Sequence, residues 1–282
     1  MFPEIFHIGS VSVRAYGLML AVSFFVGLVV ALKRAPKFGI PPVKIIDLTL
    51  VIIVAAVAGS RFFYVIYHLD EYRGHFLDVI NPFQSTGQIG IAGLSMMGGI
   101  VLVIISVILF IRLWKLPFWR TLDVFSPSFL LGLGITRIGC FLNGCCYGNP
   151  TDWFWGVVFP GNSAAGWFYP DIHIHPTQLI SSIAGFTLCG LLIFFERMKR
   201  FSGFTVIMML IFYSAFRFII DFFRYYEPSM VFMNTGGLDY SNNQALSLLI
   251  FVVSIASFIV MSKRNKQLSS LGYEEENTID DA

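Results

Sequence analysis

Long apolar runs alternate with short polar segments along most of the chain. Each run approaches the roughly 20 helical residues that are needed to cross a hydrocarbon core of about 30 Å. The runs predict seven transmembrane helices, at 12–32, 46–68, 90–111, 119–142, 177–196, 203–223 and 244–262. The pattern therefore indicates an all-α integral membrane protein.

Composition agrees with this class. Hydrophobic residues make up 56% of the chain and charged residues only 13%, which is far more apolar than an average soluble domain. The net charge is +2, and the basic residues are spread in short clusters rather than gathered into a basic domain. This distribution argues against a nucleic-acid partner.

The basic clusters also predict the orientation. Thirteen of the nineteen Lys and Arg residues follow the first, third, fifth and seventh spans, whereas the segment 143–177 contains none. Because cytoplasmic loops are enriched in Lys and Arg, we expect the N-terminus outside and the C-terminus in the cytoplasm.

The segments between the spans give the domain organisation. We expect a single transmembrane domain over 1–266 and a disordered acidic cytoplasmic tail over 267–282. The longest segment between spans, 143–176, is rich in Trp, Phe, Tyr, Gly and Pro. Amphipathic rings prefer the headgroup level of a membrane, so we expect this segment to form an ordered outer cap.

Six arginines remain outside the thirteen cytoplasmic charges, and three of them lie well inside predicted spans: Arg61, Arg137 and Arg217. Arg14 and Arg224 lie near span ends, where a long side chain can reach the interface without any further role. A charge inside the hydrocarbon usually serves a ligand, a proton path or an ion pair.

The sixth span carries its own possible partner for one arginine. Arg217, Asp221 and Arg224 are spaced at i, i+4 and i+7, which predicts that they share one helical face. Arg137 has no carboxylate at helical spacing, since Asp123 is fourteen residues earlier. We expect several helices to donate arginines to one anion, because a guanidinium matches phosphate or carboxylate. The alternative is that water reaches each arginine separately.

Three cysteines lie close together near the outer end of the fourth span: Cys140, Cys145 and Cys146. Three interpretations stay open, namely small packing residues, a disulfide of Cys140 with Cys145 or Cys146, and a metal or redox site with His175 as a fourth ligand. The spacing matches no standard zinc pattern, so we expect no metal ion and no cofactor. Cys189 is expected to fill space inside the fifth span.

Several motifs resemble the bacterial prolipoprotein diacylglyceryl transferase family. Its fourth-span signature is close to Gly-Arg-x-Gly-Asn-Phe-x-Asn-x-Glu-x-x-Gly, which is matched in register by Arg137, Gly139, Phe141, Asn143 and Gly148. Further segments resemble elements of the family and follow the family's order. They are Tyr16-Gly17-Leu18, Gly59-Ser60-Arg61, Gly98-Gly99, His175-Pro176-Thr177-Gln178-Leu179, and Arg217 with Asp221 and Arg224.

The resemblance implies a reaction at the bacterial cytoplasmic (inner) membrane. A diacylglyceryl group would pass from phosphatidylglycerol to the lipobox cysteine of a prolipoprotein, forming a thioether and releasing glycerol phosphate. The implied catalytic residues are Arg137 and Arg217 at the phosphate, Tyr16 at the headgroup and Asp221 holding Arg217. The implied substrate-binding residues are Asn143, Gly98, Gly99, Gly148, Arg61 and His175.

This chain also departs from the family pattern. Met97 stands where the family commonly has a histidine, Ser181 replaces an expected carboxylate, and Cys140 and Cys145 replace the Asn and Glu of the signature. Two alternatives therefore stay open. One is a related phosphatidylglycerol-using transferase with a different acceptor, and the other is a non-catalytic protein that binds or transports anionic lipid.

Overall fold

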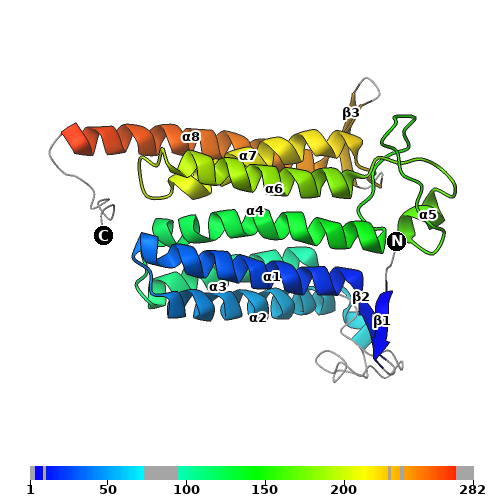
Figure 1. Cartoon of the computed structure of the whole chain (residues 1–282), viewed down its shortest axis with the longest axis horizontal. Helices are drawn as coiled ribbons and strands as arrows, with labels where there is room; N and C mark the ends of the chain where they lie inside the picture. Colours follow the sequence, from blue (N-terminus) through cyan, green and yellow to red (C-terminus); the bar gives the residue numbers. More distant parts are fainter. Residues whose placement is uncertain (1–3, 9–10, 73–94, 228–229, 236–237, 271–282) are drawn as a thin grey trace. The chain divides into compact units, whose positions relative to one another are not determined.

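Seven helices of the computed structural model are long and apolar enough to cross a membrane, as the sequence predicts (Figure 1). The structure describes residues 4–8, 11–72, 95–227, 230–235 and 238–270. The seven helices are α1 (Ala15–Arg34), α2 (Pro42–Tyr67), α3 (Met96–Leu113), α4 (Phe118–Asn143), α6 (Thr177–Glu196), α7 (Phe204–Ile220) and α8 (Asn242–Ser270).

Short elements connect the long helices. Two antiparallel hairpins, β1 (Glu4–Ile8) with β2 (Val11–Arg14) and β3 (Val231–Thr235) with β4 (Leu238–Ser241), lie directly before α1 and α8. Short 3-10 helices occur at η1 (Ala35–Phe38), η2 (Leu69–Tyr72) and η4 (Asp221–Phe223), and α5 (Ala164–Phe168) is a short α-helix. The predicted acidic tail lies mostly outside the described residues.

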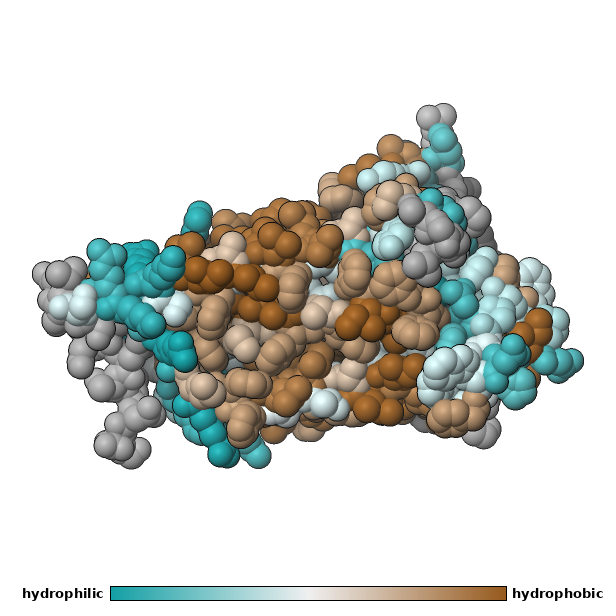
Figure 2. Space-filling model, turned by 90° about the horizontal axis from the view of Figure 1, so that it is seen from above, coloured by the Kyte–Doolittle hydropathy of each residue, from teal (hydrophilic) through white to brown (hydrophobic). Residues whose placement is uncertain are grey.

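The surface of the long helices is apolar. Figure 2 shows hydrophobic side chains over the middle of the helices and hydrophilic ones collected toward their ends. Large side chains such as Phe25, Val54 and Leu249 are each at least 60% exposed. Such apolar surface is rare on soluble monomers, whereas helices in a bilayer present it to lipid.

The chain divides into two compact units, residues 35–121 and residues 1–34 with 122–282. In the first of these units, α2 and α3 approach closely along glycines. A Cβ added at Gly98 would overlap the Gly59 carbonyl oxygen and the Phe63 side chain, and one at Gly99 would overlap the Ser60 hydroxyl. Small residues allow such close contact between membrane helices.

In the other unit, α4 lies between α1 and α6. Thr136 donates a hydrogen bond from its hydroxyl to Ser23 of α1 at 3.1 Å, and Ser182 of α6 donates to the Gly134 carbonyl at 2.8 Å. A Cβ at Gly185 would lie 2.8 Å from the Gly134 nitrogen. These small and polar interfaces explain why the fourth span is less purely apolar than most of the others.

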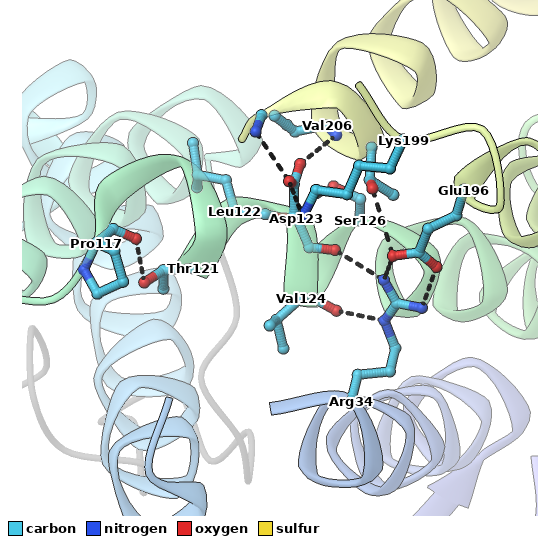
Figure 3. Close-up of polar contacts among 12 residues, drawn as sticks. Arg34, Pro117, Thr121, Leu122, Asp123, Val124, Ser126, Glu196, Lys199 and Val206 are labelled. Atoms are coloured by element: carbon cyan, nitrogen blue, oxygen red, sulfur yellow. Dashed lines mark hydrogen bonds and ion pairs between the residues drawn. The ribbon is translucent and has the colours of Figure 1, made fainter. Parts of the chain in front are cut away.

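Pro127 inside α4 leaves a backbone carbonyl without its usual helical donor, because proline has no N–H. That carbonyl belongs to Asp123, four residues earlier, and it accepts a hydrogen bond from the Arg34 guanidinium at 3.2 Å. Arg34 also forms a two-pronged ion pair with Glu196 of α6 at 2.7 Å (Figure 3). One arginine thus links the ends of three helices.

The Asp123 side chain caps a different helix. Its two carboxylate oxygens accept hydrogen bonds from the backbone N–H groups of Gly203 and Val206, both at 2.9 Å, at the start of α7 (Figure 3). Lys199 lies 3.5 Å from the same carboxylate. The first N–H groups of a helix lack partners within the helix, so this fully buried carboxylate supplies them from α4.

Candidate functional site

The end of α4 is a tight turn centred on Gly144. Gly144 has a φ of +70°; its N–H donates to the Phe141 carbonyl, and the Cys145 N–H donates to the Cys140 carbonyl, both at 3.1 Å. These two bonds form a Schellman motif, in which glycine readily takes the left-handed conformation. The turn reverses the chain directly after Asn143 and sends it into the predicted cap.

The cap is ordered, as expected from its aromatic content. Phe159, Ala165 and Ile174 form its buried core, with Tyr147 and Tyr169 packed against them. Bridges join Pro150 and Val157 to Ile174. Other rings of the cap face outward, and Phe154 is 92% exposed, which suits a position at the headgroup level.

Three motif segments meet at Gly148. Its N–H donates to the His175 carbonyl at 3.2 Å, the neighbouring Asn149 N–H donates to the Phe223 carbonyl at 3.0 Å, and Gly148 bridges to Arg224. A Cβ at Gly148 would lie 2.6 Å from both the His175 and the Phe223 carbonyl oxygens. The glycine is therefore required by the close approach of three protein segments.

The start of α6 braces the turn at the end of α4. Thr177 donates from its hydroxyl to the Cys146 carbonyl at 3.0 Å, and Gln178 donates from its amide to the Cys145 carbonyl at 2.8 Å. The His-Pro-Thr-Gln motif thus fixes the conformation of the signature turn.

The side chain of His175 forms its hydrogen bond within the cap rather than with the turn after α4. Its Nδ1 accepts a hydrogen bond from the Trp155 indole at 3.0 Å, and its ring meets Phe223 edge to face. Burial lowers the pKa of His175 below its ordinary value, which keeps the ring neutral and the acceptor available at neutral pH.

This shift makes the stability of the cap depend on pH. Because the folded pKa lies below the unfolded value of about 6.5, the stabilisation is present above that pH and is lost as the pH falls below it. We expect the thermal unfolding temperature to drop on acidification by less in His175→Gln, whose amide oxygen accepts the same bond without titrating. An equal acid-induced drop in both proteins would contradict this role.

The expected pair on the sixth span is present. Arg217 lies 3.0 Å from the Asp221 carboxylate and donates a second hydrogen bond to the Tyr226 hydroxyl at 2.9 Å. Asp221 is buried and also accepts from the Ser241 hydroxyl at 3.1 Å. The guanidinium is thus held by two partners in a fixed orientation.

The expectation that Arg224 shares the helical face of Arg217 is wrong. Helix α7 ends at Ile220, and after the 3-10 turn η4 the backbone of Arg224 is extended, with φ −91° and ψ 145°. The reason is the pairing of this segment with Gly148 described above, which competes with continuation of the helix.

The guanidinium of Arg224 is more buried than its position near the end of a predicted span suggests. Its guanidinium carbon lies 5.4 Å from the centre of the Tyr226 ring, and within the described residues its buried Nε has no hydrogen-bond partner. An unsatisfied buried donor is costly, so this group is available to an acceptor that enters the site. The family-like motif that includes Arg224 was the signal for its importance.

Arg137 comes from α4 and faces the cysteines. It interacts electrostatically with Cys140 and Cys146. Among the ion pairs of the described residues, none joins Arg137 to a carboxylate. No acidic side chain of the described residues therefore neutralises its charge.

The arginines are connected through shared neighbours. Cys146 is within electrostatic reach of both Arg137 and Arg224, and Tyr226 is within reach of both Arg224 and Arg217. Three guanidinium groups from α4, α7 and the segment after η4 are thus linked through two shared neighbours, with Asp221 paired to one of them. This arrangement supports the predicted shared anion site.

Tyr16 and Asn143 belong to the same unit. The start of α1 passes directly over α4, since a Cβ at Gly139 would lie 3.2 Å from the Tyr16 Cα, and Tyr16 interacts with Arg137. Asn143 is the last residue of α4 and lies two residues before Cys145.

Arg61, Gly98 and Gly99 lie in the other unit. Arg61 is buried on α2, and the two glycines form the close α2–α3 contact. The structure thus gives the glycines a packing role, and substrate binding by these three residues stays a prediction.

All four cysteines are free thiols. Cys189 is buried in α6 and lies against the Pro127 carbonyl at 3.5 Å, as a space-filling residue would. The other three, Cys140, Cys145 and Cys146, lie together at the turn after α4.

Known proteins are similar in sequence to most of the chain. A family model described as prolipoprotein diacylglyceryl transferase matches residues 3–260. A phosphatidylglycerol–prolipoprotein diacylglyceryl transferase of Prochlorococcus marinus (strain NATL1A) is 34% identical over 79% of this chain and 78% of its own length. One of Clostridium tetani (strain Massachusetts / E88) is 30% identical over 92% of this chain and 97% of its own length. The chain belongs to the prolipoprotein diacylglyceryl transferase family.

Proposed function

We propose that this protein transfers the diacylglyceryl group of phosphatidylglycerol to the lipobox cysteine of prolipoproteins. The observation that carries this proposal is the cluster of Arg137, Arg217 and Arg224, which contains three guanidinium groups and only one carboxylate among the described residues, Asp221, paired with Arg217. Positive charge buried at a membrane site is costly unless it serves a partner. A lipid phosphate supplies the missing negative charge and matches the donor geometry of arginine.

The reaction follows from where charge develops. The acceptor thiol gives its proton to solvent water, its sulfur attacks a glycerol carbon of the lipid, and an S–C bond forms as the bond from that carbon to the phosphate oxygen breaks. The electron pair of the broken bond leaves with glycerol phosphate. Guanidinium groups fixed at this oxygen stabilise the transition state more than the ground state.

The residues contribute to this step in different ways. Arg137, which lacks a carboxylate partner among the described residues, would contact the phosphate directly. Arg217 would act from a fixed position, since Asp221 and Tyr226 hold it. Tyr16 and Asn143 would orient the lipid headgroup beside Arg137.

The proposed orientation places this site at the outer face of the bacterial cytoplasmic membrane. The N-terminus is outside and the C-terminus cytoplasmic, consistent with the distribution of Lys and Arg. A protease site added after Ser270 should be cut from the cytoplasmic side only. Cleavage from the outer side of intact cells would contradict the orientation.

The experiment compares two acceptor peptides. Purified protein is incubated with phosphatidylglycerol and a lipobox peptide, or with the same peptide carrying serine in place of cysteine, and released glycerol phosphate is measured. We expect release with the cysteine peptide only. Release that is equal with both peptides, or with no peptide, would favour a transferase that uses a different acceptor.

A further inference from the structure

The three cysteines at the end of α4 have their sulfurs in one place. The Sγ atoms of Cys140, Cys145 and Cys146 all lie within 4.8 Å of one another. A disulfide would join two of them and leave the third unused. Three converging sulfurs match the ligands that a thiophilic metal ion prefers.

The backbone explains how the sulfurs are brought together. In a Schellman motif, the residues at either end of the longer hydrogen bond place their side chains in contact. Here these residues are Cys140 and Cys145. Cys146 follows with a φ of +60°, a conformation that costs a non-glycine residue on the order of 1–3 kcal/mol. The hydrogen bond from Thr177 to its carbonyl helps to hold it there.

The distances suit a thiophilic ion. Zinc–sulfur bonds of about 2.3 Å in a tetrahedral site place the sulfurs roughly 3.8 Å apart, which the observed cluster reaches with small side-chain movements. Cys140 is buried, whereas Cys145 and Cys146 are partly exposed, so an ion can enter from one side.

The surrounding charges are favourable too. Three thiolates around a divalent ion leave one negative charge, and Arg137 and Arg224 both lie within electrostatic reach of Cys146. A buried charge needs such compensation.

The fourth ligand does not come from His175. Its Nδ1 already accepts the Trp155 hydrogen bond, and the cluster found among the described residues contains cysteines alone. Zinc sites with three protein ligands typically keep the fourth position for water or substrate.

We propose that Cys140, Cys145 and Cys146 bind one zinc ion, and that its fourth position receives the thiol of the acceptor cysteine. The role of the acceptor rests on the proposed function. The inference departs from the expectation of no metal ion, which depended on sequence spacing alone.

The chemistry balances without a redox change. A thiol that coordinates a metal gives up its proton, here to solvent water. The resulting thiolate attacks the lipid carbon, and the electron pair of the carbon–oxygen bond leaves with glycerol phosphate. The zinc ion would therefore activate the acceptor thiol. No histidine is needed for this step, and Met97 stands where the family commonly has one.

The first test measures the metal directly. Reduced protein is stripped with a chelator, loaded with Zn²⁺, desalted and analysed for zinc by mass spectrometry. We expect about one zinc ion per chain in the parent and in Cys189→Ser, and a loss of most of it in Cys145→Ser. Size-exclusion elution checks that each variant is folded. No zinc in the parent, or equal zinc in a folded Cys145→Ser, would overturn the site.

The second test examines the fourth position. In protein loaded with Co²⁺, sulfur ligation is followed by the thiolate-to-cobalt absorption band as a lipobox peptide is added. We expect the band to grow with the cysteine peptide and to stay unchanged with its serine counterpart. No difference between the peptides would overturn the acceptor as a ligand.

Activity separates this inference from the proposed function. We expect protein without zinc to form the thioether at least about tenfold more slowly than zinc-loaded protein. Equal rates would reject the zinc role and leave the proposed function standing. Zinc binding and peptide ligation without product from any form of the protein would reject the proposed function and leave the metal site.

Discussion

Replacing Arg137 with alanine should lower the turnover of phosphatidylglycerol by about a hundredfold to a thousandfold, the usual effect of removing one preorganised donor from a transition state. The fold should survive, because within the described residues Arg137 is not part of a carboxylate ion pair. Arg137→Lys should recover only part of the activity, since lysine keeps the charge but loses the forked donor geometry. Thioether formation under saturating lipid measures the effect.

Arg197→Ala is the matched control for Arg137→Ala. Arg197 is an exposed arginine directly after α6, so its loss removes the same charge away from the site. We expect its turnover to equal that of the parent. Normal turnover by a folded Arg137→Ala protein would contradict the proposed role.

Replacing Asp123 with alanine should have the largest effect on stability. The change removes the acceptor of two backbone N–H groups at the start of α7 and the carboxylate that lies 3.5 Å from Lys199. Each buried N–H group that is left without an acceptor costs roughly 1–3 kcal/mol. Asp123→Asn should cost less, because its amide oxygen still accepts one of the bonds.

Thermal unfolding in detergent measures this loss, with Asp152→Ala as the control. Asp152 is an exposed carboxylate in the cap of the same unit. We expect a clear fall in unfolding temperature for Asp123→Ala and little change for Asp152→Ala. Equal unfolding temperatures in the parent, Asp123→Ala and Asp152→Ala would show that the hydrogen bonds from the start of α7 to Asp123 are not important for stability.

Hydropathy predicts the spans well because the bilayer sets their length. The fifth span was expected at 177–196, and α6 occupies the same residues. The ends are less accurate where another element competes. The first span was expected from residue 12, but strand β2 runs to Arg14 and α1 begins at Ala15. The last helix continues to Ser270, beyond the apolar stretch that hydropathy detects.

The candidate site was predictable in part. Charge in the spans identified Arg137 and Arg217, and helical spacing identified the pair with Asp221. Sequence spacing could not reveal that Arg224 leaves the helix, because the Gly148 pairing that ends it joins distant segments. The sequence places the three cysteines close together, but the convergence of their sulfurs depends on a left-handed residue after a Schellman turn, which spacing alone does not reveal.

The most direct measurement of the central claim is the mass of a lipobox peptide after incubation with the purified protein and phosphatidylglycerol. The account predicts a peptide that gains one diacylglyceryl group as a thioether on its cysteine. An unmodified peptide, with phosphatidylglycerol bound and intact, would contradict the assignment of the arginine cluster to diacylglyceryl transfer.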